Sequence, residues 1–308
     1  MASKSETTQR LRGVIVAMPT PMQASGAIDL GGTARLTEWL IGKDVNALFV
    51  CGTTGEGPLL DERERVETTR AAVGAARGRV PVIAHAGAVT TAATVDLAKR
   101  CVDAGADALA VVTPYYFRYR DEELIAHYVA VSAAVPDHPV LAYNIPALTG
   151  NTVTPAVARI LRDRAGLTGM KDSTGDAYGL LQLAEAGGSG FHLIVGADLL
   201  VLEVLAMGWA GMVSGPAAAI PEPYVAMWKA VASGAAVPWP QVAAAYRQVA
   251  AVCHAVRNGS DIPRIKAVLH LRGVIGPYVR APLRPLAQDE LVELRKVAGA
   301  LVGTTGFG

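Results

Sequence analysis

Lys171 is the residue in this sequence best suited to covalent chemistry. It directly follows the apolar run 167–170, so its side chain is expected at the end of a buried strand. An ammonium group held at such a position loses hydration, which favours the neutral amine that can attack a ketone. The alternative is a surface lysine that opens a loop, because most lysines in proteins are exposed. Under the first interpretation Lys171 is a nucleophile toward a carbonyl compound.

Hydroxyl groups at the ends of other apolar runs could assist such a lysine. Thr53 and Thr54 stand in the glycine-rich segment 52–57, where two hydroxyls and backbone N–H groups could hold a carboxylate. Tyr143 could relay protons to and from the lysine nitrogen. Both proposals have an ordinary alternative. The two threonines could belong to a simple Thr/Gly turn, and Tyr143 could be a half-buried tyrosine. Tyr116, which follows another tyrosine, could simply fill a contact between subunits.

Several other chemistries lack their motifs in this sequence. The six histidines do not cluster at ligand spacing and no HExxH is present, so no catalytic metal is predicted. The absence of GxSxG argues against a serine hydrolase. Neither GxxxxGK[ST] nor GxGxxG occurs at a strand–helix junction, which argues against a nucleotide-phosphate cradle.

The composition indicates a globular protein with a large core. Of its 308 residues, 51% are hydrophobic and 18% are charged, and the formal net charge is +1. Without a basic block, neither nucleic acid nor a membrane surface is expected as a partner. No secretory signal is visible in residues 1–10, and no uncharged apolar run reaches about 18 residues. Cys51, Cys101 and Cys253 are far from any CxxC pattern and suit a cytoplasmic protein with reduced thiols.

Short apolar runs alternate with helix-period segments along the first two thirds of the chain. The expected strands are 14–18, 47–50, 80–84, 108–112, 139–143, 167–170, 192–195 and 211–213. The expected helices are 30–41, 61–76, 93–104, 121–134, 154–161, 176–186, 198–207 and 223–233. Eight parallel strands joined by helices predict the α/β class and a (β/α)8 TIM barrel, although a doubly wound sheet would alternate in the same way.

The rest of the chain carries helical patterns only. Helices are expected at 240–257, 263–271 and 289–301, and the proline-rich stretch 237–240 is a plausible joint. The sequence therefore predicts a barrel domain over residues 11–234, which carries the site, and a C-terminal helical domain over residues 235–308.

Four motifs together resemble the dihydrodipicolinate synthase/N-acetylneuraminate lyase family in order and spacing. They are Gly52-Thr53-Thr54-Gly55-Glu56, Thr113-Pro114-Tyr115-Tyr116, Tyr143-Asn144-Ile145-Pro146 and Met170-Lys171-Asp172-Ser173-Thr174-Gly175. The segments 17–21 and 280–286 are similar to that family's two ends, so the likeness spans nearly the whole chain. The resemblance implies a barrel with a C-terminal helical domain, a homotetramer built as a dimer of dimers, and no metal or organic cofactor.

The same resemblance implies a role for each matching side chain. Lys171 looks like the Schiff-base lysine and Tyr143 like the tyrosine that passes protons near its nitrogen. Thr53 and Thr54 look like the pair that holds the carboxylate of a pyruvate-type 2-oxo acid, with Thr54 linked to the proton relay. Tyr116 matches a tyrosine that completes the relay from a neighbouring subunit.

The substrate pocket implied by the resemblance has two matches and two departures. Gly196 and Val213 match positions that line the pyruvate pocket. Leu148 stands where the synthase branch commonly has an arginine for the aldehyde's carboxylate, a contact that an apolar side chain cannot make. Asp198 is followed by Leu199, whereas the sialic-acid lyase branch tends to have an Asp-Glu pair for sugar hydroxyls. Leu148 and Asp198 are therefore expected near the second substrate.

Three functions stay open at this point. The leading one is a class I carbon–carbon lyase, an aldolase that cleaves or condenses a pyruvate-type 2-oxo acid with an aldehyde. The second is a dehydratase of 2-keto-3-deoxy sugar acids that uses the same lysine imine, or a true 4-hydroxy-tetrahydrodipicolinate synthase despite Leu148. The third is a non-catalytic sensor on the same barrel, which the intact Lys171, Tyr143 and threonine pair argue against.

Overall fold

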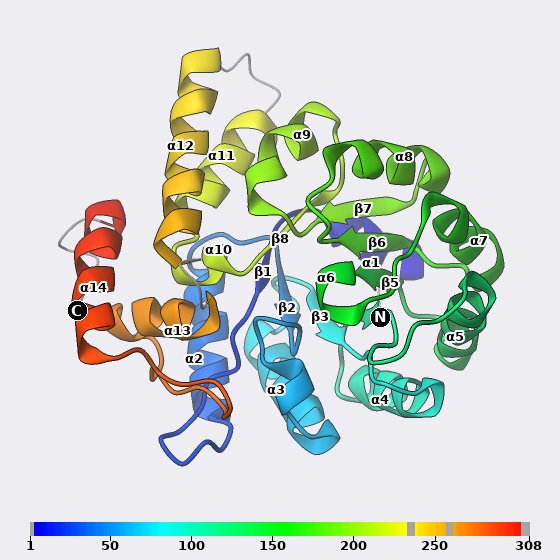
Figure 1. The fold of residues 1–308 in the computed structure, drawn as a ribbon, viewed down its shortest axis with the longest axis horizontal. Helices are drawn as coiled ribbons and strands as arrows, with labels where there is room; N and C mark the ends of the chain where they lie inside the picture. Colours follow the sequence, from blue (N-terminus) through cyan, green and yellow to red (C-terminus); the bar gives the residue numbers. More distant parts are fainter. Residues whose placement is uncertain (1–2, 233–237, 257–260, 303–308) are drawn as a thin grey trace.

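A closed barrel of eight parallel strands forms the centre of the molecule (Figure 1). The computed structural model describes residues 3–232, 238–256 and 261–302. The strands are β1 (Gly13–Ala17), β2 (Ala47–Val50), β3 (Val82–His85), β4 (Ala108–Val112), β5 (Val140–Asn144), β6 (Gly169–Asp172), β7 (His192–Val195) and β8 (Gly211–Ser214). Each strand pairs with its neighbours in chain order and β8 pairs with β1, so the predicted barrel is confirmed.

The seam between β1 and β8 is unusually tight. Gly13 pairs with Gly211 across it. A Cβ added to Gly211 would lie 2.3 Å from the carbonyl oxygen of Gly13, so the backbones leave no room for a side chain. Glycine at position 211 therefore permits the last strand to close the barrel against the first.

The strands sort their side chains into two apolar clusters. The barrel interior contains Leu11, Ile15, Ala17, Ala47, Phe49, Ile83, Ala108, Ala110, Val112, Leu141, Tyr143, Ile194, Ala210 and Val213. Alternate residues such as Leu48, Ala142 and Met170 belong to the larger cluster between strands and helices. Because successive strand residues point to opposite faces, Lys171 points into the barrel together with Tyr143.

An outer ring of helices covers the strands. It consists of α2 (Leu30–Ile41), α3 (Glu62–Ala76), α4 (Thr91–Asp103), α5 (Asp121–Ala134), α7 (Pro155–Ala165), α8 (Ala177–Gly187), α9 (Val201–Ala206) and α11 (Glu222–Ala232). Several begin at a side-chain cap: the caps are Asp29, Asp61, Thr90, Thr154 and Asp176. No helix among the described segments combines the length and the apolar character needed to cross a membrane.

Short elements that the sequence analysis did not predict lie at both ends of the barrel. Helix α1 (Lys4–Arg10) begins with a capping box between Ser3 and Glu6 and lies behind the strands in Figure 1. The loops that follow the strands contain η1 (Gly57–Leu59), α6 (Pro146–Thr149), η2 (Asp198–Leu200) and α10 (Pro216–Ala219). The expected helix 198–207 is thus a 3-10 turn followed by α9.

Three helices follow the barrel, as predicted. They are α12 (Trp239–Val256), α13 (Asp261–Leu271) and α14 (Gln288–Val302). Helix α12 packs on α11, and α13 packs on α10 at the carboxyl end of β8. The expected domain boundary between residues 234 and 235 lies outside the described residues and stays a prediction, as do residues 233 and 257 of the expected helices and residue 237 of the expected joint.

An ion-pair cluster joins the end of α13 to the start of α11. Arg272 Nη2 lies 2.5 Å from Glu222 Oε1, and Lys43 Nζ lies 2.9 Å from the same oxygen. Partial burial disfavours the Glu222 carboxylate, but the hydrogen bonds from Arg272 and Lys43 outweigh that effect and lower its pKa to about 2. The charged carboxylate therefore stabilises the folded state.

Glu222→Gln should lower the thermal midpoint at pH 7, because the amide lacks the charge that Arg272 and Lys43 stabilise. A depressed pKa contributes stability above the ordinary value of 4.5, and that contribution is lost as the pH falls toward about 2. The difference between the two proteins should therefore shrink over that window, which a series of melting curves measures. A difference that stays constant from pH 7 to pH 3 would contradict this assignment.

Candidate active site

Lys171 lies in a cavity at the carboxyl end of the barrel. Its side chain is 7% exposed, and its Nζ lies 3.8 Å from the centre of the Tyr143 ring and 5.0 Å from that of Phe49. The cavity has a volume of about 250 Å³. Its described lining consists of Ala17, Thr53, Thr54, Tyr143, Ile145, Leu148, Lys171, Ser173, Gly196, Val213, Gly215, Pro216, Asp261 and Ile265.

The register of the sheet places Tyr143 beside Lys171. The two residues are direct partners in the pairing of β5 with β6. Burial disfavours ionisation of the Tyr143 hydroxyl, but the Lys171 charge and hydrogen bonds with Lys171, Thr53 and Ser173 outweigh it and lower its pKa. The tyrosine hydroxyl is thereby suited to exchange a proton with the lysine nitrogen.

The two threonines occupy the loop that follows β2. Thr53 Oγ1 lies 3.1 Å from the Tyr143 hydroxyl. A Cβ added to Gly215, at the end of β8, would lie 2.8 Å from Thr54 Oγ1, so Thr54 rests against that glycine. The resemblance assigned the link with the proton relay to Thr54, whereas the structure has the Thr53 hydroxyl against Tyr143. Both hydroxyls line the cavity, as expected for groups that hold a carboxylate.

The same loop has a backbone that few sequences can adopt. Cys51 and Glu56 have left-handed φ angles of 57° and 56°. Backbone N–H groups of Glu56 and Gly57 donate to the carbonyls of Thr53 and Gly52, each at 3.0 Å. A Cβ added to Gly57 would lie 1.9 Å from the Cys51 carbonyl oxygen. The loop therefore closes on itself in one conformation, which fixes the direction of the threonine hydroxyls.

Gly196, at the end of β7, leaves room for the reactive lysine. A Cβ added there would lie 2.1 Å from Ser173 Oγ and 3.0 Å from Lys171 Cε. The Ser173 hydroxyl can rotate away, but the lysine stem is confined by the rings of Phe49 and Tyr143. The position is therefore sensitive to a single methyl group.

Gly196→Ala should reduce the formation of a covalent adduct at Lys171 by about fivefold or more, because an overpacked site costs roughly 1–3 kcal/mol. The rate of adduct formation with a 2-oxo acid measures the effect. Gly74→Ala is the matched control, because a Cβ at Gly74 has open space around it. Gly190→Ala would not serve, because Gly190 has a positive φ that an alanine would strain. Adduct formation that is equally fast in the Gly196 and Gly74 variants would exclude the proposed crowding.

Phe49 and Ser173 are among the site residues that were not predicted from the sequence. Phe49 is buried in the barrel interior beneath Lys171, and only the alternation along β2 could have indicated it. Ser173 lines the cavity because the loop after β6 is held by Asp172, which accepts hydrogen bonds from Asn144 and from the backbone N–H of Thr174. The signal in the sequence that could have indicated Ser173 is its position two residues after Lys171.

His85 is buried close to the site but does not line the cavity. Arg65 Nη2 lies 2.8 Å from its Nδ1 and donates to its carbonyl oxygen. Burial and the positive charges of Arg65 and Lys171 hold the pKa of His85 well below its ordinary value. Its ring packs edge to face against Phe49 and Tyr143. His85 therefore supports the walls of the barrel as a neutral side chain.

Of Leu148, Asp198 and Tyr116, the structure places only Leu148 in the lining of the cavity. Leu148, in α6, lines it and is 63% exposed. Asp198 is buried and accepts a hydrogen bond from the Ser214 hydroxyl, so its side chain does not line the cavity. Tyr116 is 86% exposed and its ring contacts Phe117, so within one chain the structure does not bring it to Lys171.

The described residues include no metal-binding cluster. Among residues 3–232, 238–256 and 261–302, no three His, Cys, Asp or Glu side chains lie together in a way that could hold a metal ion. The groups that the cavity does offer are an amine, a tyrosine hydroxyl, several small hydroxyls and, from α13, the carboxylate of Asp261. These groups can form an imine, move protons and bind a carboxylate.

Comparisons with known proteins agree with this arrangement. The model of the Dihydrodipicolinate synthetase family matches residues 10–301. The chain is 36% identical over 294 residues to the 4-hydroxy-tetrahydrodipicolinate synthase of Methylococcus capsulatus, and the match covers 94% of this chain and 100% of the relative.

Solved structures of similar proteins share the fold. YagE, a prophage protein of the dihydrodipicolinic acid synthase family from E. coli K12 in complex with pyruvate, has a TM-score of 0.88 at 28% identity, and the match covers 94% of this chain and 98% of YagE. The chloride-inhibited dihydrodipicolinate synthase from Acinetobacter baumannii, also complexed with pyruvate, has a TM-score of 0.88 at 30% identity, covering 94% and 99%. Together with the geometry around Lys171, these matches show that the chain belongs to the dihydrodipicolinate synthetase family.

Proposed function

We propose that this protein is a lysine Schiff-base lyase that condenses pyruvate or a related 2-oxo acid with an aldehyde, or cleaves the product of that reaction. The observation that carries the proposal is the Lys171 amine, held in a cavity between the rings of Tyr143 and Phe49. The pyruvate complexes of YagE and of the Acinetobacter synthase support a 2-oxo acid as the first substrate.

The proposed reaction begins with an imine. The Lys171 amine attacks C2 of the 2-oxo acid and water leaves, giving an iminium ion that withdraws electrons from C3. Loss of a C3 proton gives an enamine, whose C3 then forms a bond to the aldehyde carbon while the aldehyde oxygen takes up a proton. Hydrolysis of the new iminium releases the product and the free amine. Cleavage follows the same steps in reverse.

The hydroxyl groups direct these steps. Tyr143 passes protons to and from the reacting atoms, and Thr53, whose hydroxyl contacts it, extends the relay. The 53–54 pair and the loop's backbone hold the substrate carboxylate so that C2 faces Lys171. Gly196 and Val213 shape the pocket around the three-carbon unit.

Reductive trapping tests the proposal directly. The protein is treated with pyruvate and sodium borohydride, and the adduct is located by peptide mass spectrometry. A reduced pyruvate adduct on Lys171 is the expected result. A folded protein that gives no adduct with pyruvate or with larger 2-oxo acids would refute the Schiff-base assignment.

The second substrate is expected to differ from that of the synthases in one respect. Leu148 lines the cavity at the position where the synthase branch commonly has an arginine, so it offers no charge to a carboxylate-bearing aldehyde. The activity of a 4-hydroxy-tetrahydrodipicolinate synthase, for which the Methylococcus relative is named, remains the second candidate function, because the match covers the whole of that relative. Asp198 is buried at the start of η2 in the loop after β7, and we propose that it lies near the second substrate.

Leu148→Arg should raise activity toward an aldehyde that carries a carboxylate, relative to a neutral aldehyde of similar size. A charged hydrogen bond contributes about 1.5–3 kcal/mol, which corresponds to about tenfold or more in the ratio of the two kcat/KM values. Leu148→Met is the matched control, since it changes shape without adding charge. An unchanged ratio in the arginine variant would contradict a role of position 148 in substrate choice.

Product analysis distinguishes an aldolase from a dehydratase. Both use the lysine imine, and they differ in what leaves the substrate. Pyruvate plus an aldehyde indicates cleavage of the C3–C4 bond. A dioxo acid with its carbon chain intact indicates loss of water, and would replace the aldolase assignment by that of a hydro-lyase.

The assembly and location of the protein belong to the same proposal. Tyr116 and Phe117 are 86% and 61% exposed, which suits rings that are covered by a second subunit. We expect a homotetramer, a dimer of dimers, in which Tyr116 completes the proton relay of a neighbouring site. The buried thiols of Cys51, Cys101 and Cys253 suit the cytoplasm. Sedimentation of the purified protein measures the assembly directly.

A further inference from the structure

A buried carboxylate anchors the back of the threonine loop. Glu56 is 1% exposed and stands two residues after Thr54. Lys266 Nζ, in α13, lies 2.5 Å from Glu56 Oε1, and both side chains are fully buried. Glu56 Oε2 accepts a hydrogen bond of 2.7 Å from the backbone N–H of Arg280. Two residues from the chain's C-terminal region thus hold a loop near its beginning.

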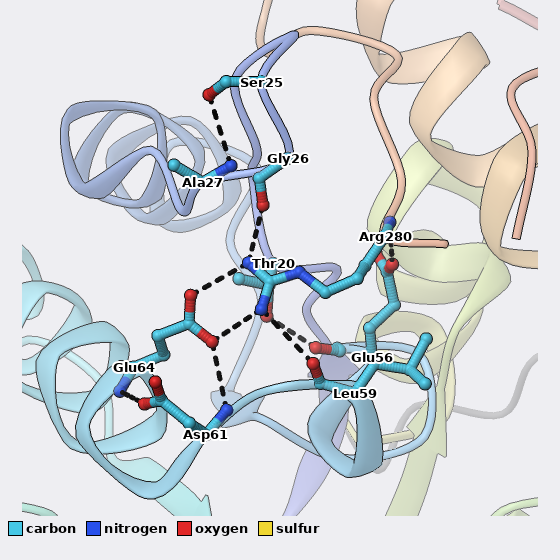
Figure 2. Close-up of polar contacts among 10 residues, drawn as sticks. Thr20, Ser25, Gly26, Ala27, Glu56, Leu59, Asp61, Glu64 and Arg280 are labelled. Carbon is cyan, nitrogen blue, oxygen red and sulfur yellow. Dashed lines mark hydrogen bonds and ion pairs between the residues drawn. The ribbon is translucent and has the colours of Figure 1, made fainter. Parts of the chain in front are cut away.

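The Arg280 side chain extends this anchor to the rest of the loop (Figure 2). Its guanidinium contacts both carboxylate oxygens of Glu64 at 2.6 and 2.9 Å, and it donates to the carbonyls of Leu59 and Gly26 at 3.2 and 2.6 Å. Such two-pronged contacts of arginine with a carboxylate are geometrically specific. They fix the turn after the threonine loop to the start of α3.

A third contact holds the loop at Gly55. The Thr20 hydroxyl donates to the carbonyl of Gly55 at 2.6 Å, and both residues are buried. Lys266 itself also donates to the carbonyl of Tyr278 at 2.7 Å, which ties α13 to the segment that carries Arg280. The loop is therefore held both by the segment that follows β1 and by residues near the C-terminus.

None of these charged groups lines the cavity, but α13, the helix that carries Lys266, contributes lining residues. Asp261 and Ile265 are lining residues, and Lys266 follows Ile265 directly. A fully buried ion pair is seldom more stable than apolar residues of similar volume, because both charges lose their hydration. Stability alone therefore gives little reason for Glu56 and Lys266 at these positions, whereas precise placement of the loop does.

We infer that Glu56, Lys266 and Arg280 are positioning residues that fix the threonine loop, and that this region near the C-terminus thereby sets the affinity for the 2-oxo acid carboxylate. The inference rests on the proposed function for its substrate. The Glu56 carboxylate restrains the loop from outside the cavity, which keeps Thr53 against Tyr143 and Thr54 against Gly215. Its loss should weaken carboxylate binding far more than the chemistry at Lys171.

The test uses a double variant, Glu56→Gln with Lys266→Met, which removes both charges and leaves neither one buried alone. Reductive trapping at increasing pyruvate concentration gives the half-saturating concentration and the maximal rate. We expect the half-saturating concentration to rise about tenfold or more, with the maximal rate changed less than about threefold. A merely structural pair would instead give a lower thermal midpoint and an unchanged half-saturating concentration.

The matched control is the second ion pair between the C-terminal helices and the barrel. Glu222→Gln with Arg272→Met also removes a charged pair, but neither residue lines the cavity or contacts the threonine loop in the structure. This control should change the thermal midpoint and leave the half-saturating concentration as in the wild type. An equal rise in both double variants would overturn the inference, because it would reflect general loosening of the fold.

Hydrogen exchange separates this inference from the proposed function. The amides of Glu56 and Gly57 donate within the loop, so they should exchange faster in the Glu56/Lys266 variant than in the wild type, without any substrate present. Unchanged exchange at both amides would overturn the inference whether or not pyruvate is trapped. Suppose that the wild type gives no pyruvate adduct, yet the loop amides exchange faster in the double variant. This pair of results would refute only the Schiff-base assignment and would support the anchoring role.

Discussion

Lys171→Ala should abolish covalent capture of pyruvate and reduce turnover to the background level. The reason is that no other group lining the described cavity is an amine, so the iminium ion cannot form. We expect a loss of at least about 10³-fold, in the range typical for removal of an essential catalytic group. Borohydride trapping followed by peptide mass spectrometry, together with a turnover assay, measures both effects.

The fold should survive this change. Lys171 projects into a cavity, so truncation enlarges that space without breaking the packing between strands and helices. Circular dichroism and the thermal midpoint check the fold, and Lys99→Ala on the exposed face of α4 is the control for general loss of a lysine. Turnover that persists in Lys171→Ala at the wild-type rate would eliminate the lysine mechanism.

Tyr143→Phe should preserve imine formation in part but slow turnover by about 10²- to 10⁴-fold, the usual contribution of a positioned acid–base group. The phenyl ring keeps the contact with Lys171, while the hydroxyl that meets Thr53 is removed. Single-turnover trapping and the steady-state kcat report the two effects separately. A kcat within a few fold of the wild type would assign the proton transfer to another group.

Tyr128→Phe provides a control with the same chemical change. Tyr128 is fully buried in α5 and donates to the carbonyl of Val111, away from the cavity. Its loss should lower stability by about 1 kcal/mol and leave kcat unchanged. An ultraviolet titration adds a second readout, since the lowered pKa of Tyr143 predicts a phenolate that forms at a lower pH than is ordinary for tyrosine and is missing in Tyr143→Phe.

The barrel could be predicted because its physical signals are local. Each strand is a short apolar run, several of the helices that follow begin at a side-chain cap, and the period of two along the strand decides which residues point inward. That alternation places Lys171 and Tyr143 in the interior, and the order of parallel strands makes β5 and β6 neighbours. These two side chains therefore meet for reasons that the sequence carries.

Other parts of the site depend on contacts that no local pattern encodes. Asp261 and Ile265 line the cavity only because α13 folds back over α10, far along the chain from the strands. Glu56 lies within a motif that the sequence analysis quoted, yet its partners are more than two hundred residues away. The sequence could mark these residues as polar or apolar, but their place at the site is decided by tertiary packing.

The seam between Gly13 and Gly211 bears on how the protein is made. A ribosome releases β1 first and β8 long after Lys171, so β1 and β7 present open edges until residues 211–214 emerge. The anchors of Glu56 come later still, with α13 and Arg280. A nascent chain halted before Gly211 would already contain the amine and the hydroxyls of the site, yet it would have no closed cavity in which they could react together.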